Sequence, residues 1–518
     1  MKGGTQTVTK SITVTDPLDS WTQQTTNNTG YLRAAVWGKD RFVVAELFGA
    51  VLTSWDGVTW TNVGELPDFD CDPRLAFGKG VFVAAGKKDG SAASQVCYSP
   101  DGRSWSTANF PGGIPQIRDV ASSNNGFVAV GDAGTVLTSP DGISWSLATV
   151  AGAPAFRFVT HNGSVWMAVS THSPSGQDET VWTSVNGITW TQQGNLGFDV
   201  SGVAARAGTL YAVGWYGGIE YSTDNGLNWL AAVTPGTTRW STGNIAIAPD
   251  GTFLVTARAM DEGGTPQALL VSTNGTEWTR SSAGTTFAWD VRALVSGFGR
   301  FLASADGGVV RTSSGLYPTN TAPSASLTLA PASLSARSGR LYAGTATDPD
   351  GDALTYYFDF GLPGLIADGS SVVKSFDFGG TYHCTFRVFD GKGGLTTLTQ
   401  AITVTDPARQ FTQRTSGTAN NLNAITTNGN LAVAVGGTGG VVRTSPDGVT
   451  WTTRTVASST NITFRGATWD GSKFIIVGYD YNFTPPTVGK ESSIPPPMVP
   501  LGPSVSVAAP SETTSWKP

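Results

Sequence analysis

One short pattern recurs through most of this chain and constrains its fold more than any other feature. At Thr138–Trp145 the pattern reads T-S-P-D-G-I-S-W. Pro140 presets φ for a type I turn, Asp141 can accept hydrogen bonds from nearby backbone amides, and Gly142 supplies the left-handed residue that follows. Trp145 then begins the next segment with a large apolar side chain. The pattern therefore predicts a β-hairpin.

Copies of this turn are spread along the chain, each at the end of a short apolar repeat. The copies are Ser54–Trp60, Ser99–Trp105, Ser184–Trp190, Ser222–Trp229, Ser272–Trp278 and Ser445–Trp451. The apolar segments are Phe42–Ala45, Val81–Ala85, Phe127–Val130, Val165–Val169, Leu210–Val213, Phe253–Ala257 and Phe301–Ala305. Their near-continuous runs of Val, Ala, Phe and Leu favour strands covered on both faces, as in sheets that stack on one another. We therefore expect an all-β fold made of repeated four-stranded blades.

The turns resemble the Asp-box of bacterial sialidase-like (BNR-type) β-propellers, whose usual form is S-x-D-x-G-x-x-W. Ser222–Trp229 has this full length, the other copies are one residue shorter, and Asn186 and Asn274 replace the acid. Asparagine supports the same kind of turn. In the families that carry the box, it lies on the face away from the ligand. The resemblance therefore implies a β-propeller in which the boxes are structural, and the seven apolar segments predict seven blades.

The two ends of the first domain predict how its ring closes. The seventh repeat, Val291–Leu316, ends without a box tryptophan. Ser20–Gln24 reads S-W-T-Q-Q and matches T-W-T-Q-Q at Thr189–Gln193, which follows a box. We expect this first strand to complete the last blade, because such closure leaves no open sheet edge. Residues 18–318 are therefore predicted to be one domain.

A second kind of domain follows Pro318–Pro323, which we expect to be a linker. Residues 345–361 read T-A-T-D-P-D-G-D-A-L-T-Y-Y-F-D-F-G, and residues 379–394 read G-G-T-Y-H-C-T-F-R-V-F-D-G-K-G-G. These segments are similar to PKD domains, which implies that residues 319–407 form a small immunoglobulin-like β-sandwich. Residues 1–17 repeat residues 391–407 without a gap, so they are predicted to be the last strand of a truncated PKD domain.

After the sandwich the box pattern resumes. Residues 408–481 contain apolar strands and one box, so we expect the start of a second β-propeller. Residues 482–518 are rich in Pro and Ser and carry neither pattern. We expect this segment to be a disordered tail.

Composition excludes several classes of function. Charged residues make up 14% of the chain and the net charge is −6, so we expect no nucleic-acid partner. No apolar run approaches the roughly 20 residues of a membrane helix, so we expect no membrane insertion.

Cys71, Cys97 and Cys384 are too few for a disulfide framework or a zinc site, and a single Cys71–Cys97 bridge is one alternative. The turn-rich composition and the PKD resemblance favour an extracellular or cell-surface location, and a signal peptide is expected upstream of this fragment.

Closely spaced acids in the PKD-like segment suggest a metal. Asp348, Asp350, Asp352 and Asp359 supply the oxygen ligands that calcium prefers. The alternative is that the D-P-D-G-D segment is a turn whose acids accept hydrogen bonds from backbone amides. Calcium is the one cofactor that the sequence suggests.

The sequence favours a binding protein over an enzyme. A sialidase needs an Arg-Ile-Pro motif, and G-G-I-P-Q-I-R lacks the arginine before Ile114. Asp119, Asp199 and Asp290 begin inner strands and are the candidates for the paired carboxylates of a xyloglucanase-like enzyme. We favour a non-catalytic secreted or cell-surface adhesion scaffold that binds polysaccharide or a surface protein. The alternative is a glycoside hydrolase, sialidase-like or xyloglucanase-like, or the accessory region of one.

A recurring arginine marks the predicted ligand face. It stands near the start of the inner strand in five repeats, as Arg33, Arg74, Arg118, Arg157 and Arg292. Loops between the second and third strands should reach the same face and bring Trp215, Tyr216 and Arg258. Guanidinium groups with aromatic platforms suit an anionic ligand. The alternative is that each arginine pairs with an acid such as Asp119 or Asp290 and only holds the ring together.

Overall fold

The structure is a computed structural model that describes residues 17–480 and 505–507. Gaps fall at residues 89, 91–92, 151, 153–154, 171–178, 216–217, 237–238, 261–266, 283–290, 329–332, 363–365, 407–411 and 456–461. The described residues form β-strands and two 3-10 turns, η1 (Pro17–Asp19) and η2 (Asp132–Gly134). None of the helices in these ranges is long and apolar enough to cross a membrane. The chain divides into two compact units, Met1–Asp406 and Pro407–Pro518.

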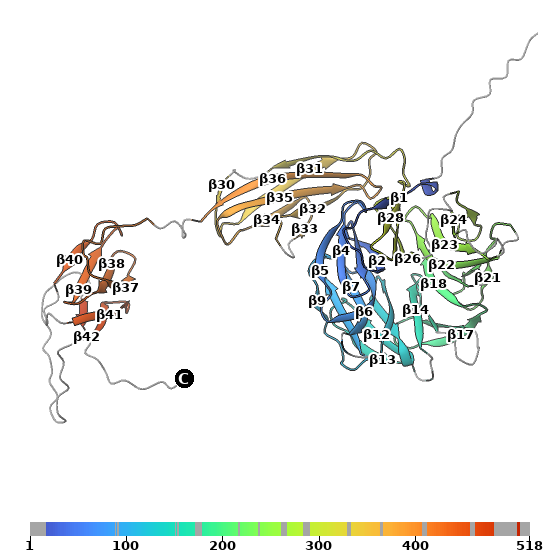
Figure 1. Ribbon diagram of the computed structural model, residues 1–518, viewed down its shortest axis with the longest axis horizontal. Coiled ribbons are helices and arrows are strands. Elements are labelled where there is room, and N and C mark those ends of the chain that lie inside the picture. Colours follow the sequence, from blue (N-terminus) through green and yellow to red (C-terminus); the bar gives the residue numbers. More distant parts are fainter. Residues whose placement is uncertain are drawn as a thin grey trace, which may run out of the picture. The chain divides into compact units, whose positions relative to one another are not determined.

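Seven four-stranded antiparallel sheets occupy the first part of unit 1 among the described residues. Within each sheet, neighbouring strands along the chain pair in order (Figure 1). The strands, sheet by sheet, are β2 (Leu32–Gly38), β3 (Arg41–Glu46), β4 (Ala50–Ser54) and β5 (Thr61–Glu65); β6 (Phe69–Gly78), β7 (Val81–Lys88), β8 (Ser94–Ser99) and β9 (Ser106–Thr107); β10 (Ile117–Ser123), β11 (Gly126–Gly131), β12 (Thr135–Ser139) and β13 (Ser146–Thr149); β14 (Phe156–His161), β15 (Trp166–Ser170), β16 (Glu179–Ser184) and β17 (Thr191–Leu196); β18 (Val200–Arg206), β19 (Thr209–Gly214), β20 (Gly218–Ser222) and β21 (Leu230–Ala231); β22 (Trp240–Ile247), β23 (Phe253–Ala259), β24 (Gln267–Ser272) and β25 (Thr279–Arg280); and β26 (Val291–Gly297), β27 (Arg300–Ala305) and β28 (Val310–Ser313), completed by β1 (Trp21–Gln24).

The recurring turn connects the third and fourth strands in six of these sheets, and the closing sheet, whose fourth strand is β1, lacks it. In the Ser139–Trp145 copy, the Gly142 amide donates to Ser139 Oγ at 2.8 Å, and Asp141 Oδ1 accepts from the amides of Ile143 and Ser144 at 2.8 and 2.9 Å. Gly142 has φ +78°, which favours glycine. Asn186 and Asn274 accept the equivalent amides with their side-chain oxygens, so the acid itself is dispensable for the turn.

The turn tryptophan is a core residue. Trp145 is 5% exposed, and its indole nitrogen donates to the Gly142 carbonyl oxygen at 3.0 Å. Its ring belongs to one apolar cluster with Val83 and Val96 of the preceding sheet and Phe127 of its own. The predicted structural role of the turn is therefore consistent with its geometry.

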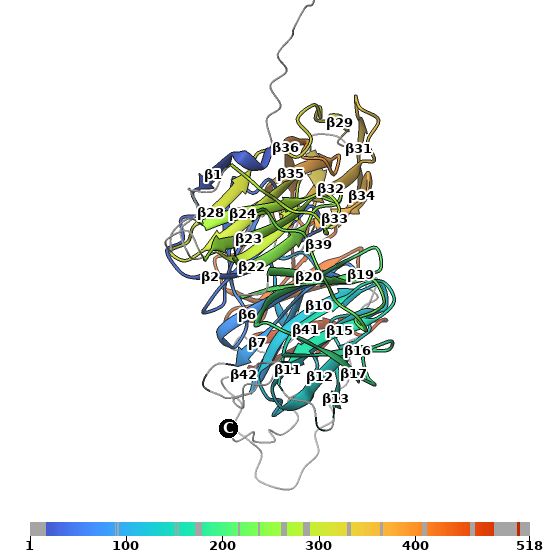
Figure 2. The same cartoon turned by 90° about the vertical axis from the view of Figure 1, so that its right-hand side faces the viewer.

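The sheets form a closed ring. Each first strand contacts the first strands of the two neighbouring sheets, in the cycle β2, β6, β10, β14, β18, β22, β26 and back to β2. β1 pairs antiparallel with β28, from Trp21 opposite Ser313 to Gln24 opposite Val310. Trp21 packs in the apolar cluster between this closing sheet and its neighbour, where a turn tryptophan lies in other sheets. The predicted ring closure is thus confirmed, and the arrangement is a β-propeller, with its first strands at the centre in Figure 1 and seen from the side in Figure 2.

The antiparallel order gives every sheet two distinct ends. The start of the first strand and the loop between the second and third strands lie at one end, which we call the arginine end. The turns between the first and second strands and the box turns lie at the other end, which we call the box end.

A two-layer β-sandwich completes unit 1. One layer contains β29 (Ser324–Thr328), β31 (Arg340–Thr347) and β34 (Ser371–Lys374); the other contains β30 (Ser333–Ser335), β36 (Leu395–Thr405), β35 (Gly380–Phe389), β32 (Thr355–Asp359) and β33 (Ile366–Asp368). Cys384, Phe386 and Val388 point into its core, as the sequence alternation predicts. The predicted linker is tied to the sandwich, because Asn320 Nδ2 donates to Asp390 Oδ2 at 2.7 Å.

Unit 2 is a four-stranded sheet beside a smaller one. The strands are β37 (Leu422–Thr427), β38 (Ala432–Gly436), β39 (Val441–Ser445) and β40 (Thr452–Arg454), followed by β41 (Ile462–Trp469), β42 (Phe474–Asp480) and β43 (Val505–Val507). β43 pairs parallel with β42, so part of the tail predicted to be disordered adds a strand. The rest of that tail, and the predicted PKD strand at residues 1–16, lie outside the described residues.

Candidate functional site

Four of the five predicted arginines occupy the same irregular position of the first strand. Arg33, Arg118, Arg157 and Arg292 each stand at a β-bulge, where the register with the second strand shifts by one residue. A bulge bends the strand and re-aims the side chain at that point. Arg74 instead lies one position later, because Asp72 and Pro73 both fall in the irregular stretch of β6. The structure therefore corrects the predicted fivefold equivalence to a fourfold one.

Three of these arginines pair with carboxylates at the arginine end. Arg118 forms a bidentate pair with Asp132, Nε to Oδ1 at 2.9 Å and Nη2 to Oδ2 at 3.0 Å. Arg292 pairs with Asp306 in the same way, at 3.0 and 2.6 Å, and holds the pKa of that carboxyl below its usual range. Arg74 reaches Asp72 at 3.1 Å.

Asp119 is not the carboxylate partner of any arginine in the ion pairs of the described residues, so that part of the prediction was wrong. The acids that do pair lie in the same sheet as their arginines, in the loop between the second and third strands for Asp132 and Asp306. Asp119 instead accepts the amides of Val120 and Val159, each at 2.9 Å. Val159 lies in the next sheet, so Asp119 links two sheets. Asp290 lies outside the described residues.

Arg33 and Arg157 differ from the other arginines of this position. Within the described ranges, neither has a carboxylate within ion-pair distance. The Arg33 guanidinium lies 5.9 Å from the ring centre of Tyr31, and that of Arg157 lies 5.1 Å from the ring centre of Phe158. Both nevertheless lie close enough to a carboxylate to lower its pKa, Arg33 to Asp306 and Arg157 to Glu179, without a direct ion pair.

Two exposed aromatic side chains at the arginine end were not predicted from the sequence. Tyr31 is 48% exposed and Phe48 is 60% exposed. The Leu47 amide donates to the Tyr31 carbonyl oxygen at 2.7 Å, which holds their two loops together. Phe48 lies in the loop between the second and third strands of the first sheet, and the predicted Trp215 lies in the same loop of the fifth sheet. This equivalence of position could have identified Phe48 from the sequence.

The other predicted ligand residues are placed less uniformly. Trp215 is 54% exposed and directly follows β19, as predicted. Tyr216 lies outside the described residues. Arg258 lies within strand β23, opposite Ser241, and not in a loop. The exposed aromatic side chains at the arginine end therefore include Trp215 in the fifth sheet and Tyr31 and Phe48 in the first.

Two buried carboxyls at the arginine end have raised pKa values. Burial raises the pKa of Asp119 to about 6, although two amides donate to it. Glu179 is 1% exposed, and burial raises its pKa to about 7 against the opposing effects of the Val200 amide and Arg157. Its Oε2 accepts the Val200 amide at 2.8 Å, while Oε1 has no hydrogen-bond partner. Both side chains hold neighbouring sheets together.

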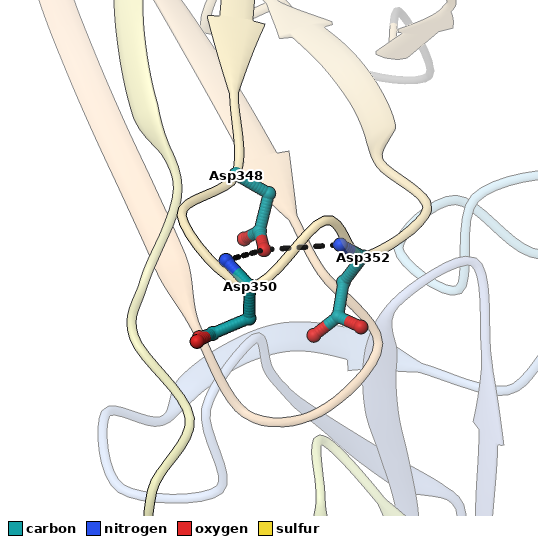
Figure 3. Close-up of side chains that lie close together, drawn as sticks. All are labelled: Asp348, Asp350 and Asp352. Atoms are coloured by element: carbon teal, nitrogen blue, oxygen red, sulfur yellow. Dashed lines mark hydrogen bonds between the residues drawn. The ribbon is translucent and has the colours of Figure 1, made fainter.

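Three of the four predicted metal ligands lie together. One carboxylate oxygen from each of Asp348, Asp350 and Asp352 lies within 4.8 Å of the others (Figure 3). Asp348 Oδ1 also accepts the amides of Asp350 and Asp352 at 2.9 and 3.0 Å, as the alternative turn reading requires. Lys392 Nζ lies 2.5 Å from Asp352 Oδ1. Asp359 is not in this group, because it pairs with Arg103 and Arg387.

The structure contradicts the one disulfide that the sequence allowed. Cys97 is a free, buried thiol, so the Cys71–Cys97 disulfide does not form. Burial raises its pKa to about 12, which leaves it unreactive.

Comparison with known proteins supports the second kind of domain. Residues 320–405 match the family model of the PKD domain. No curated protein sequence matches the chain. The chain is similar to YCF48 bound to D1 peptide, with 15% identity over 58% of this chain and 98% of that one, at a TM-score of 0.46. It is also similar to the extracellular domain of the hybrid two-component system BT4673 of B. thetaiotaomicron, with 8% identity over 74% of this chain and 58% of that one, at 0.44. The WD40 β-propeller domain of Doa1 gives 13% identity over 57% and 95%, at 0.42.

Proposed function

We propose that this chain is a non-catalytic, extracellular or cell-surface binding scaffold whose first domain, a seven-bladed Asp-box propeller, binds an acidic polysaccharide at its arginine end. The observation that carries the proposal is the patch of Tyr31, Arg33 and Phe48. There, two exposed aromatic side chains accompany a guanidinium that has no carboxylate partner among the described residues.

The chemistry of this patch suits a sugar acid. Aromatic faces offer apolar surface to the C–H faces of sugar rings, and a guanidinium can bind a carboxylate or sulfate through two parallel hydrogen bonds. Arg157 offers a second cation of the same kind in the fourth sheet. Arg118 and Arg292 contribute less, because each already pairs with its own carboxylate.

The remainder of the chain fits a repeated binding surface. Unit 2 begins with a four-stranded sheet whose third and fourth strands are joined by the same Ser-Pro-Asp-Gly turn, and we take it as the start of a second propeller. Two propeller faces on one chain bind a polymer more strongly than one, because the second contact is intramolecular.

We further propose that Asp348, Asp350 and Asp352 hold a calcium ion in the PKD domain. Asp348 Oδ2 and Asp352 Oδ2 are buried and have no hydrogen-bond partner, which suits oxygen ligands of a hard cation. Lys392 competes for Asp352 and must move aside when the ion binds.

Affinity electrophoresis of the full chain tests the ligand face. In a gel containing polygalacturonate, the wild-type chain should be retarded relative to a neutral dextran gel, and retardation should fall as salt rises. The double variant Arg33→Gln with Arg157→Gln should lose most of the retardation, and so should Tyr31→Ala with Phe48→Ala.

The matched control removes the same charge from the box end. Lys79 and Arg206 adjoin turns between first and second strands. The double variant Lys79→Gln with Arg206→Gln should remain retarded like the wild type. If both charge variants migrate alike, or the wild type ignores polygalacturonate at low salt, the arginine end is not the ligand face.

A further inference from the structure

The box of the first sheet differs from every other box at its second position. That position is Trp55 in the first sheet. In the other boxes it is proline, valine or threonine, at Pro100, Pro140, Val185, Thr223, Thr273 and Pro446. Proline suits the turn, whereas tryptophan adds nothing to it. The tryptophan therefore calls for another explanation, and the contacts of its ring provide one.

Trp55 lies between two guanidinium groups from different domains. Arg41 of β3 lies 3.8 Å from the Trp55 ring centre, and Arg387 of the sandwich strand β35 lies 4.7 Å from it. Sandwich rings also approach, with Tyr357 at 5.7 Å and Phe389 at 5.4 Å between ring centres. Such cation–π contacts are strong when they are shielded from water, and Arg41 is only 2% exposed.

The Trp55 ring accounts for one otherwise unsatisfied group. Arg41 Nε is buried without a hydrogen-bond partner, whereas Arg387 Nη1 lies 3.5 Å from Asp359 Oδ2. An N–H group that faces an aromatic ring loses less than one that faces aliphatic carbon, because the ring face is electron-rich. Burial also lowers the pKa of Arg41 to about 10, which still leaves it charged at neutral pH.

Polar pairs surround this apolar contact. Arg103 of the second sheet pairs with Asp359 at 3.3 Å, and Lys39 pairs with Asp368 at 3.3 Å. Thr355 Oγ1 donates to Asp40 Oδ2 at 2.5 Å. An apolar centre with a polar rim is the anatomy of a specific protein interface.

The sandwich also contacts the closing sheet, on the other side of the ring seam. Phe298, in the turn between β26 and β27, lies 6.2 Å from Phe389 between ring centres. Gly299 has φ +61°, and a Cβ there would lie 2.4 Å from the Lys392 carbonyl oxygen, so only glycine allows this approach. One apolar cluster contains residues of the first sheet, the closing sheet and the sandwich, among them Phe42, Leu302 and Tyr357.

We propose that the PKD sandwich is a clamp that recognises the first sheet through Trp55 and bridges the seam at which β1 closes the ring. The seam joins strands from the two ends of the propeller sequence. A body bound to both sheets beside it opposes their separation, in addition to the hydrogen bonds between β1 and β28. The box end of the first sheet is thus a docking surface for the chain's own sandwich, and Trp55 marks it. The second unit has Pro446 at this position and lacks that mark.

Hydrogen exchange of the full chain tests the clamp. Trp55→Pro installs the residue that other boxes carry, so the turn should persist while the stack is lost. We expect amides of β1 and β28 to exchange about tenfold faster or more, because seam opening becomes easier, while amides of β11 and β12 exchange as before. Calorimetry should show the sandwich and propeller unfolding in separate transitions, whereas the wild-type unit unfolds in one. Pro140→Ala is the matched control at another box and should change neither reading.

Arg387→Leu tests the same contact from the sandwich side and keeps the experiment decisive if Trp55→Pro fails to fold. It should also speed exchange of β1 and β28. If either folded variant separates the two unfolding transitions but leaves seam exchange unchanged, the sandwich docks without clamping. If the variants leave both readings unchanged, Trp55 does not mediate the recognition.

Discussion

Two side-chain oxygens order the box turn at Ser139–Trp145: Ser139 Oγ accepts the Gly142 amide, and Asp141 Oδ1, which asparagine can replace, accepts the next two amides. Asp141 and Asn186 accept two successive amides with nearly identical distances. The tryptophan that follows contributes differently, through burial. The tryptophan should therefore contribute more than the acid to the free energy of unfolding.

Trp145→Ala should lower the free energy of unfolding by about 3–5 kcal/mol, since truncation of a large buried aromatic removes its contacts and leaves a cavity. Asp141→Asn should cost less than about 1 kcal/mol, because the amide oxygen still accepts both N–H groups. Urea denaturation of both variants provides the measurement. A tryptophan variant with wild-type stability would mean that the box has another role.

Glu179 should make the propeller less stable as pH rises. Its pKa is about 7 in the folded chain and near 4.5 when unfolded, so the folded state binds more protons between these values. Its contribution is therefore fully present below about pH 4.5 and is lost as pH rises through 7. Glu179→Gln should remove this slope and be more stable than the wild type at pH 8, by roughly 1–3 kcal/mol. Thermal unfolding from pH 5 to 8 would show it, and identical slopes in both proteins would refute it.

Calcium should stabilise the sandwich through its three clustered acids. At calcium concentrations 10–100 times the dissociation constant, the free energy of unfolding should rise by roughly 1–3 kcal/mol. Asp350→Asn should abolish the effect, and Lys392→Met should increase it by releasing Asp352. Calorimetry with calcium, magnesium or chelator is the measurement. Equal unfolding temperatures in calcium and chelator would exclude the site.

Among the elements, β1 should stabilise the whole propeller, although it is only four residues long. It covers the edge of β28 and so converts an open stack of sheets into a ring. Removing residues 1–24 should lower the melting temperature of unit 1 and make the chain aggregate through the exposed β28 edge. Melting curves and light scattering test this, and an unchanged curve would show that the ring does not depend on its closing strand.

The repeated elements were predictable from sequence because the signal lies within each repeat. Box turns and apolar strands are set by residues a few positions apart, and each is found where the pattern indicates. The closing strand was recognised because Ser20–Gln24 matches the strand that follows a box. The β-bulges were not, because a bulge is a property of two paired strands. The sequence pattern alone therefore predicts that Arg74 is equivalent to Arg33, which is wrong. It also does not predict that Arg118 pairs with Asp132 across the sheet.

At the scale of the whole molecule, the sequence predicts a linker and then a sandwich, but not the contacts between the sandwich and the propeller. These contacts join Trp55 to Arg387 and Lys39 to Asp368, residues far apart in the chain. Two residues that depart from the local sequence pattern could have indicated these contacts. Trp55 replaces the usual turn residue, and Arg387 and Phe389 lie at the end of a strand whose alternation otherwise predicts an exposed arginine. Such departures identify contacts between domains that no local rule requires.

The propeller has a docking end and a proposed ligand end. The box end binds the sandwich at the first sheet, and the arginine end carries Tyr31, Arg33 and Phe48. Hydrogen exchange of the full chain with and without polygalacturonate tests whether the ligand binds at the arginine end. We expect protection in the segments around Tyr31–Arg33 and Leu47–Gly49 and none in the box turns such as Ser139–Trp145. Protection of the box turns, with the Tyr31 and Phe48 segments unchanged, would contradict it.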